Sequence, residues 1–170
     1  MIDGETTRLR EWRESDLVLL GELRNDLALQ RLLLAHARPN TADRVRAWVE
    51  RVSGADGSVL FVVAGLDDAP VGFVQVTGMD LIDGYGHLGI ALAGIARGKG
   101  HGHEAIRLLA GYLRSTFDLR KLVLEVAATN EPAIGLYESL GFRRVGTLVD
   151  HVRDGDDFLD VLVMELMLGP

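Results

Sequence analysis

The chain has 170 residues, enough for one domain with its own core, and hydrophobic residues make up 48% of it. The formal net charge of −7 argues against nucleic acid as the main partner, and no apolar run is long enough to span a membrane. Because the chain has no cysteine and its first residues lack the layout of a signal peptide, we expect no disulfide, no Cys-ligated metal and a cytoplasmic location.

The first half of the chain predicts a strand, two helices and three more strands. Residues 7–12 alternate between polar and apolar side chains, which is typical of an edge strand. Ser15 and Asp16 can cap a helix that runs to about residue 29, and residues 41–43 open a second helix with one apolar face. The three strands are expected over residues 59–65, 71–77 and 85–92.

The second half begins with a glycine loop and a helix that runs to about residue 117. A strand is expected over residues 121–127, and a strand pair over 143–152 and 157–167. Between them Asn130 caps a short helix, which Gly141 ends. The element order β-αα-βββ-α-β-α-ββ predicts one α/β domain over residues 1–170, with a mixed, mostly antiparallel sheet of about seven strands.

A glycine-rich run between an expected strand and an expected helix is the most informative feature of the chain. It consists of Arg97, Gly98, Lys99, Gly100, His101 and Gly102. Glycines here let backbone N–H groups approach an anion at the positive end of the helix, which predicts a phosphate site. A Walker A loop is excluded because Lys99 is followed by Gly100 and not by a hydroxyl residue. Gly-x-Gly-x-Gly is also too short for a dinucleotide fingerprint.

Two motifs give the chain a resemblance to a known family. Arg97, Gly100 and Gly102 match the Arg/Gln-x-x-Gly-x-Gly/Ala signature of the GCN5-related N-acetyltransferase (GNAT) superfamily. Residues 130–142 are similar to its Asn-x-x-Ala-x-x-Leu-Tyr-x-x-x-Gly-Phe segment. The resemblance covers nearly the whole chain, and residues 23–26 and 41–48 resemble the RimJ/RimL-like branch. It implies the GNAT fold, whose element order is the one predicted above.

The resemblance also implies that acetyl-CoA binds to the glycine loop. The backbone of residues 97–102 would hold the pyrophosphate, with Lys99 as an added cation. Backbone groups of Ile90, Ala91 and Leu92 would hold the pantetheine arm in a slot that a strand bulge opens. Asn130 is either a contact of that arm or simply a helix cap.

Tyr137 lies where the superfamily has a tyrosine that protonates the departing thiolate. The alternative is a packed aromatic residue with a satisfied hydroxyl. A phenol of pKa about 10 would transfer its proton to a thiolate of pKa about 8.5 only at a cost of roughly 2 kcal/mol. A strong hydrogen bond during cleavage of the C–S bond would remove this difficulty.

Two residues are candidates for the base that deprotonates the acceptor amine. Glu125 alternates with Leu124 and Val126 and so leaves the opposite face of its strand, unless it is a paired structural carboxylate. Imidazole is a common base or water relay in enzymes, so His87 is the other candidate, unless it is a strand-end surface residue.

The expected reaction is direct transfer of the acetyl group to a primary amine of a small molecule or of a peptide N-terminus, in a ternary complex. An acetyl-CoA-binding sensor or scaffold without turnover, and a transferase for another acyl-CoA, remain open alternatives. His101 and His103 offer only two nitrogens, so no metal is expected. A homodimer is expected through the C-terminal hairpin, because its second strand has more apolar residues than one alternating face requires: Phe158, Leu159, Val161 and Leu162.

Overall fold

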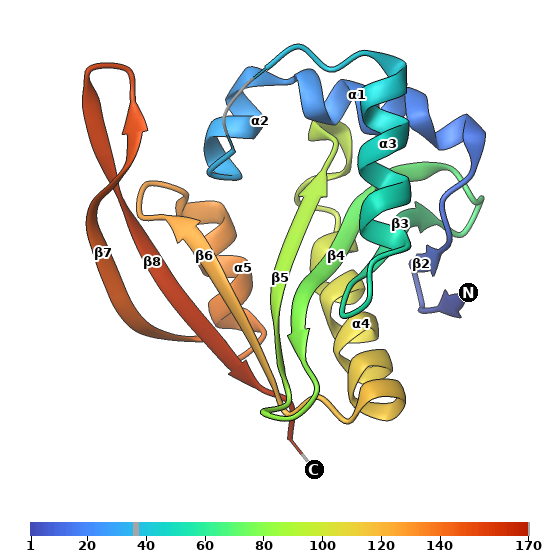
Figure 1. Cartoon of the computed structure of the whole chain (residues 1–170). Helices are drawn as coiled ribbons and strands as arrows, with labels where there is room; N and C mark the ends of the chain where they lie inside the picture. The colour runs from blue at the N-terminus through green and yellow to red at the C-terminus, as the bar shows by residue number, and fades with distance from the viewer. Residues whose placement is uncertain (36–37, 170) are drawn as a thin grey trace.

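The computed structural model describes residues 1–35 and 38–169. Within them a sheet of eight strands has the order β1-β2-β3-β4-β5-β6-β8-β7, and only the β5–β6 pair is parallel (Figure 1). The strands are β1 (Ile2–Asp3), β2 (Thr7–Arg10), β3 (Val59–Gly65), β4 (Pro70–Asp80), β5 (Tyr85–Leu92), β6 (Lys121–Ala127), β7 (Arg143–Asp154) and β8 (Asp157–Met167). This is the predicted mixed sheet, with the short β1 as an additional strand.

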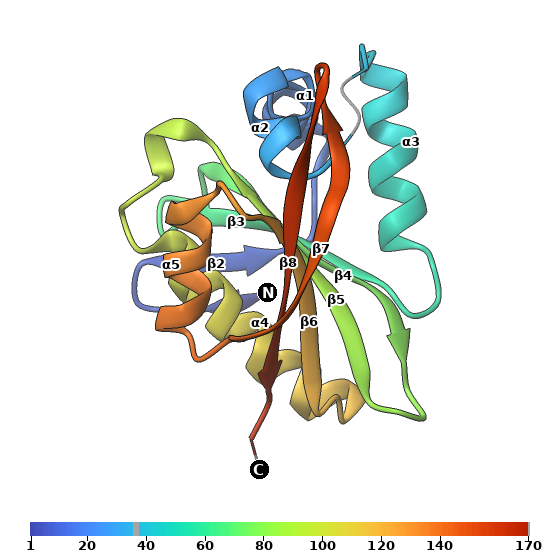
Figure 2. The ribbon, with the colours of Figure 1, turned by 90° about the vertical axis from the view of Figure 1, so that its left-hand side faces the viewer.

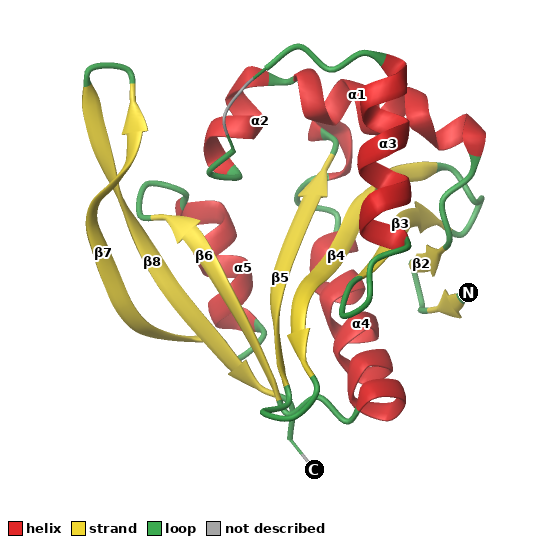
Figure 3. Cartoon of the chain, viewed as in Figure 1, coloured by secondary structure: helices red, strands yellow, loops and turns green. Residues whose placement is uncertain are grey.

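Helices cover both faces of the sheet, as Figure 2 shows from the side. They are the 3₁₀ turns η1 (Glu14–Asp16) and η2 (Gly94–Ala96), and the α-helices α1 (Leu17–Asn25), α2 (Leu27–Leu32), α3 (Ala42–Ser53), α4 (His101–Phe117) and α5 (Glu131–Ser139). Helices α4 and α5 lie on one face, and α1 and α3 lie on the other (Figure 3). The N-terminal helices therefore cover the face opposite the glycine loop helix.

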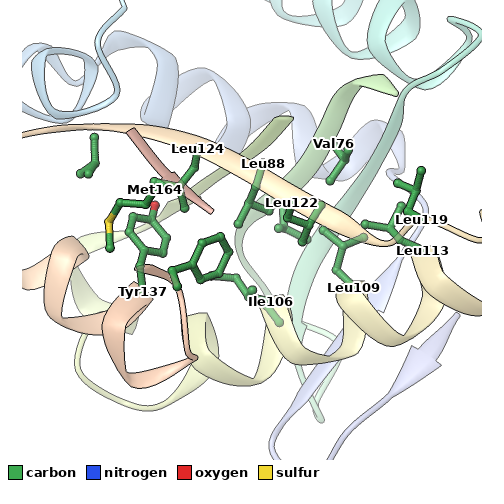
Figure 4. Packing of buried hydrophobic residues seen from close by; sticks show 14 of the residues in the cluster. Val76, Leu88, Ile106, Leu109, Leu113, Leu119, Leu122, Leu124, Tyr137 and Met164 are labelled. Carbon is green, nitrogen blue, oxygen red and sulfur yellow. The ribbon is translucent and has the colours of Figure 1, made fainter. Parts of the chain in front are cut away.

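Each face of the sheet has its own apolar cluster. Alternate residues of β6, such as Leu122 and Leu124, pack with α4 and α5 in the larger cluster (Figure 4). The second cluster joins α1 and α3 to the sheet through Trp48, Phe73 and their neighbours. Because side chains alternate along a strand, residue 125 leaves the sheet on the α1–α3 side.

Strands β5 and β6 separate after a short paired stretch. Their pairing covers residues 85–87 and 121–123, and its last pair is His87–Val123. Beyond it β5 stays paired with β4 as far as Leu92, and β6 stays paired with β8 as far as Ala127. Each strand keeps its outer partner, so the two diverge and leave the gap that Figure 1 shows beneath α2.

The predicted bulge at residues 90–92 is therefore wrong. The β4–β5 register is continuous over this stretch, and its irregularity lies earlier, between Thr77 and Asp80. The slot exists because two strands part, not because one of them bulges.

Two N-terminal details also differ from the prediction. Strand β2 lies between β1 and β3, so it is not an edge strand. Asp16 does not cap α1 with its side chain, because its carboxylate accepts two hydrogen bonds from the buried Arg10 guanidinium, at 2.7 and 2.9 Å. Leaving a buried guanidinium without a counter-charge costs more than leaving a helix end uncapped, because water can reach the helix end. The expected single helix is also divided at Asp26, which caps α2 by accepting from the N–H of Leu29 at 3.0 Å.

Candidate active site

A cavity of about 570 Å³ occupies the gap between β5 and β6. This volume falls within the range of small-molecule and cofactor sites. The cavity is lined by parts of α2, β5, the glycine loop, β6 and α5, which are far apart in the sequence: Leu29, Leu32, Leu33, Leu88, Gly89, Ile90, Ala91, Leu92, Arg97, Gly98, Gly100, Gly102, His103, Glu125, Val126, Asn130, Pro132, Ala133, Leu136 and Tyr137.

The glycine loop is shaped for an anion. Gly98 and Gly100 have φ angles of +72° and +87°, a region that residues with a Cβ rarely adopt. Helix α4 begins directly after Gly100 and has no side-chain cap, so its first N–H groups are free to bind a ligand at the positive helix end. The Nε of Arg97 donates to the carbonyl of Leu92 at 3.1 Å, which ties the loop to the end of β5.

Gly102 allows α4 to approach β5 and α5 closely. A Cβ at this position would lie 3.2 Å from Cδ2 of Leu136 and 3.3 Å from Cδ1 of Leu92. The glycine therefore leaves open the part of the cavity between the strand and the two helices. The helix N-terminus, the left-handed loop and this space together fit the pyrophosphate and pantetheine portions of coenzyme A.

Two residues of the predicted loop set are not in the cavity lining. Lys99 is exposed outside it. The Nδ1 of His101 lies 3.0 Å from the Thr7 hydroxyl, so its ring faces β2 rather than the cavity. The predicted contact of the loop with the pyrophosphate uses backbone groups, and the backbone of His101 forms the first residue of α4. His103 lines the cavity instead.

Asn130 has the geometry of both predicted roles. Its Oδ1 accepts from the N–H of Ala133 at 3.3 Å, which caps α5, and the residue also lines the cavity. Capping uses one side of the carboxamide only, so its NH₂ group is available to a ligand.

Tyr137 lies deep in the cavity wall. Its side chain extends from α5 toward β6 and packs near Leu124 and Met164 (Figure 4), and the residue is 8% exposed. Burial raises the pKa of Tyr137 to about 12. Within the described residues no hydrogen bond to its hydroxyl is found, and this oxygen is not among the fully buried atoms without a partner, so the cavity gives a ligand access to it.

The two candidate bases have different positions. Glu125 has an exposed side chain, lines the cavity and has no ion-pair partner among the described residues. His87 lies on the same face of the sheet, but it belongs to the last β5–β6 pair, outside the cavity lining, and its ring contacts that of Tyr85 at 5.9 Å. The structure therefore brings Glu125, and not His87, together with Tyr137.

The leucines of α2 are the part of the site that sequence reasoning missed. Leu29, Leu32 and Leu33 line the cavity at the end near the N-terminal helices. Helix α2 is also linked to the β7–β8 hairpin by an ion pair of 3.6 Å between Arg31 and Asp154. The run of three leucines from Leu32 was the available signal, because three successive apolar residues exceed one face of a short helix.

Neither a metal site nor a membrane span is found in the described residues. No three side chains of the metal-binding types come together there. No described helix combines the length and the apolar character that crossing a bilayer requires.

Comparisons with known proteins show the family of the chain. The family model described as "Acetyltransferase (GNAT) domain" matches residues 7–143. An uncharacterised N-acetyltransferase of the SPbeta prophage of Bacillus subtilis is 29% identical over 145 residues, 85% of this chain and 80% of that protein. A spermidine N(1)-acetyltransferase of Vibrio cholerae is 29% identical over 107 residues, 63% of this chain and 62% of that protein.

Solved structures share the fold. The crystal structure of spermidine N-acetyltransferase from Vibrio cholerae in complex with CoA and spermine has a TM-score of 0.89 and 23% identity, and the match covers 97% of both chains. At this identity the likeness concerns the fold alone. The family match, which spans most of the chain, shows that this protein belongs to the GNAT acetyltransferase family and is an acetyl-CoA-dependent acetyltransferase.

Proposed function

We propose that residues 1–170 form one domain of the RimJ/RimL-like branch that acetylates a primary amine of a small molecule or of a peptide N-terminus. One observation supports this proposal above others. A single cavity is lined by an anion-binding glycine loop, the unpaired side of β5, a buried phenol and an exposed carboxylate. Acetyl transfer to an amine requires a held donor, a neutral amine and a stabilised leaving thiolate, and these groups match the three needs.

The N–H groups at Gly98, Gly100 and the start of α4 would hold the pyrophosphate. The backbone of residues 90–92, on the side of β5 that has lost its β6 partner, would hold the pantetheine arm. Acetyl-CoA supplies the acetyl group as a thioester. The protein's contribution is then to orient that thioester toward Tyr137 and Glu125.

Tyr137 would act by donating a hydrogen bond to the sulfur as negative charge develops on it. With a pKa of about 12, the phenol stays protonated at every physiological pH. Full proton transfer from this phenol to a thiolate of ordinary pKa 8.5 would be unfavourable by about 5 kcal/mol. Donation without transfer avoids this cost, and burial strengthens it by excluding water.

Glu125 would accept the proton of the acceptor amine, directly or through water. Deprotonating a lysine-like amine at pH 7 costs about 4.6 kcal/mol, whereas deprotonating an α-amine near pKa 8 costs only about 1.4 kcal/mol. The need for a base therefore depends on the acceptor. Relatives of both kinds exist, since an N-alpha-acetyltransferase of Saccharolobus solfataricus is 28% identical over 107 residues, 57% of this chain and 64% of that protein.

The test is acetyl-CoA-dependent thiol release, read with a thiol-reactive dye that finds no cysteine in the protein. The acceptors are polyamines, amino sugars, aminoglycosides and short peptides with free N-termini. In Glu125→Gln, kcat/KM should fall roughly 100-fold or more at neutral pH, and the loss should shrink as rising pH deprotonates the amine itself. Glu131→Gln, an exposed glutamate outside the cavity lining, is the matched control. Equal kcat/KM in Glu125→Gln and the wild type at all pH values would refute the role.

We also propose that the protein self-associates through the β7–β8 hairpin. Val161 and Leu162 are buried within the chain, so they are not the surplus apolar surface they were expected to be. Exposed apolar side chains remain on both strands of the hairpin, since Val149 on the edge strand β7 is 71% exposed and Phe158 on β8 is 45% exposed. A spermidine N-acetyltransferase of Vibrio cholerae has been solved as a dodecamer. A monomer mass by light scattering at micromolar concentration would contradict this proposal.

A further inference from the structure

Arg24, in the last turn of α1, forms no ion pair with any residue that the structure describes. Its guanidinium carbon lies 4.5 Å from the centroid of the Trp48 ring. Its Nε is buried and has no hydrogen-bond partner within residues 1–35 and 38–169. Stacking on an indole stabilises a guanidinium by about 0.5–2 kcal/mol, but it satisfies none of the N–H donors.

The surroundings of Arg24 are cationic. Burial lowers the pKa of Arg24, and the charges of Arg38 and Arg51 lower it further. From Arg24 to Arg51 the sequence has six arginines and three acidic residues, although the whole chain has a net charge of −7. The two loop residues outside the described part, His36 and Ala37, have no carboxyl group. The group that is missing here is therefore an anion, because a half-buried guanidinium beside other cations is costly without one.

The Arg24–Trp48 pair lies on the same side of the sheet as Glu125. Trp48 contacts Phe73 edge-on at 5.0 Å, and Phe73 pairs across β4–β5 with Ala91, which lines the cavity. Adjacent strands are about 4.8 Å apart, so β4 lies roughly 10 Å or more from β6 and its Glu125. Arg24 and Trp48 are outside the cavity lining, so only an extended ligand could reach both Arg24 and Glu125.

A second orphan atom lies along the same wall. The Oε1 of Gln75 is buried without a partner in the described residues, and Gln75 follows Phe73 by two positions on the same face of β4. Its side chain would lie 3.4 Å from a Cβ on Gly89, so it covers a glycine that lines the cavity. In the described chain these are the two buried side-chain polar atoms without partners, and both belong to the α1–α3 side of the sheet. Their donor and acceptor characters suit a polar, extended ligand.

We infer that Arg24 binds a carboxylate of the acceptor, whose amine lies at Glu125. This inference rests on the proposed function and narrows it to an elongated amino-carboxylate, of which a short peptide is the natural form. A guanidinium offers parallel N–H donors that match a carboxylate in geometry. A polyamine would instead bring ammonium groups against Arg24, Arg38 and Arg51.

Binding tests the inference without turnover. In Trp12→Phe the remaining tryptophan is Trp48, so its fluorescence reports ligands at Arg24. Trialanine should bind roughly 10- to 100-fold more tightly than trialanine amide, which lacks the carboxylate. Adding Arg24→Gln should abolish this preference, and Arg24→Lys should keep part of it. Failure of both peptides to bind, equal binding of the two, or an unchanged preference in Arg24→Gln would each overturn the inference.

Turnover separates this inference from the proposed function. With thiol release as the assay, kcat/KM should be higher for trialanine than for its amide and for spermidine. In Arg24→Gln the kcat/KM values of trialanine and its amide should become equal. Arg24-dependent binding without thiol release would leave the carboxylate site intact and refute the proposed function. Thiol release with equal kcat/KM for trialanine and its amide would support the proposed function and refute the carboxylate site at Arg24. Unchanged acetyl-CoA affinity by calorimetry shows that Arg24→Gln is folded, and Arg51→Gln, at an exposed position, supplies a milder second variant.

Discussion

Replacing Tyr137 with phenylalanine removes one oxygen atom and leaves the ring packed against Phe142, at 5.5 Å between ring centroids. The hydroxyl has no partner within the described residues, so its loss should leave the melting temperature unchanged or slightly raised. In the reaction, however, it would donate to a developing thiolate in a buried site. A hydrogen bond to a charged group contributes about 1.5–3 kcal/mol, which corresponds to a fall in kcat of roughly 10- to 150-fold.

The assay is steady-state thiol release over a range of pH, with acetyl-CoA affinity measured separately by calorimetry. We expect kcat to fall in Tyr137→Phe while the affinity for acetyl-CoA changes by less than about twofold. Because the pKa of Tyr137 is about 12, the wild type should lose no activity through this phenol below about pH 11. Equal kcat in the variant would refute the role of the hydroxyl. An alkaline loss near pH 9 that disappears in Tyr137→Phe would refute the argument that it donates without transferring its proton.

Three further substitutions test the loop and its support. In Gly100→Ala the new Cβ meets no atom within 4 Å, but alanine at a φ of +87° costs roughly 1–2 kcal/mol. The affinity for acetyl-CoA, measured by calorimetry, should therefore fall by about tenfold. Unchanged affinity would mean that the loop conformation is not needed. Gly102→Val should weaken acetyl-CoA binding more strongly, because even its Cβ lies 3.2 Å from Leu136 and 3.3 Å from Leu92, and an equal effect of the two substitutions would contradict the close approach. Burial raises the pKa of Glu104, but hydrogen bonds from the Thr6 hydroxyl and from the N–H groups of residues 5 and 6 outweigh it and hold this pKa at about 2. The stabilisation by the Glu104 carboxylate is therefore complete above its ordinary pKa of 4.5 and is lost as pH falls toward 2. Glu104→Gln should thus be less stable than the wild type by roughly 1–3 kcal/mol at neutral pH and equally stable near pH 2. A stability difference that does not vary with pH would contradict this.

The fold was predictable wherever the signal is local. The strands over residues 59–65, 85–92 and 121–127 have the predicted bounds, because runs of apolar residues between turn signals need no distant partner to be recognised. The cap at Asn130 is confirmed for the same reason, since Ala133 is only three residues away. Asp16 was mispredicted because its partner Arg10 reaches it from a strand, and a buried ion pair overrides a local capping preference.

The candidate site divides along the same line. Its contiguous motifs, the glycine loop and the segment around Tyr137, could be found from spacing alone, as could the alternation that turns Glu125 away from the core. Spacing could not choose between Glu125 and His87, because the choice depends on where β5 and β6 stop pairing. Nor could it place the leucines of α2 in the cavity or Arg24 over Trp48.

The amino-acid sequence by itself thus determined the family, the element order and the position of the glycine loop, because each depends on residues close together in the chain. Only the tertiary structure decided which carboxylate enters the cavity, how far burial raises the pKa of Tyr137 and which cation is left without a counter-charge. These properties depend on what surrounds a side chain in space. That environment is set by strand pairing and helix packing between segments distant in the chain.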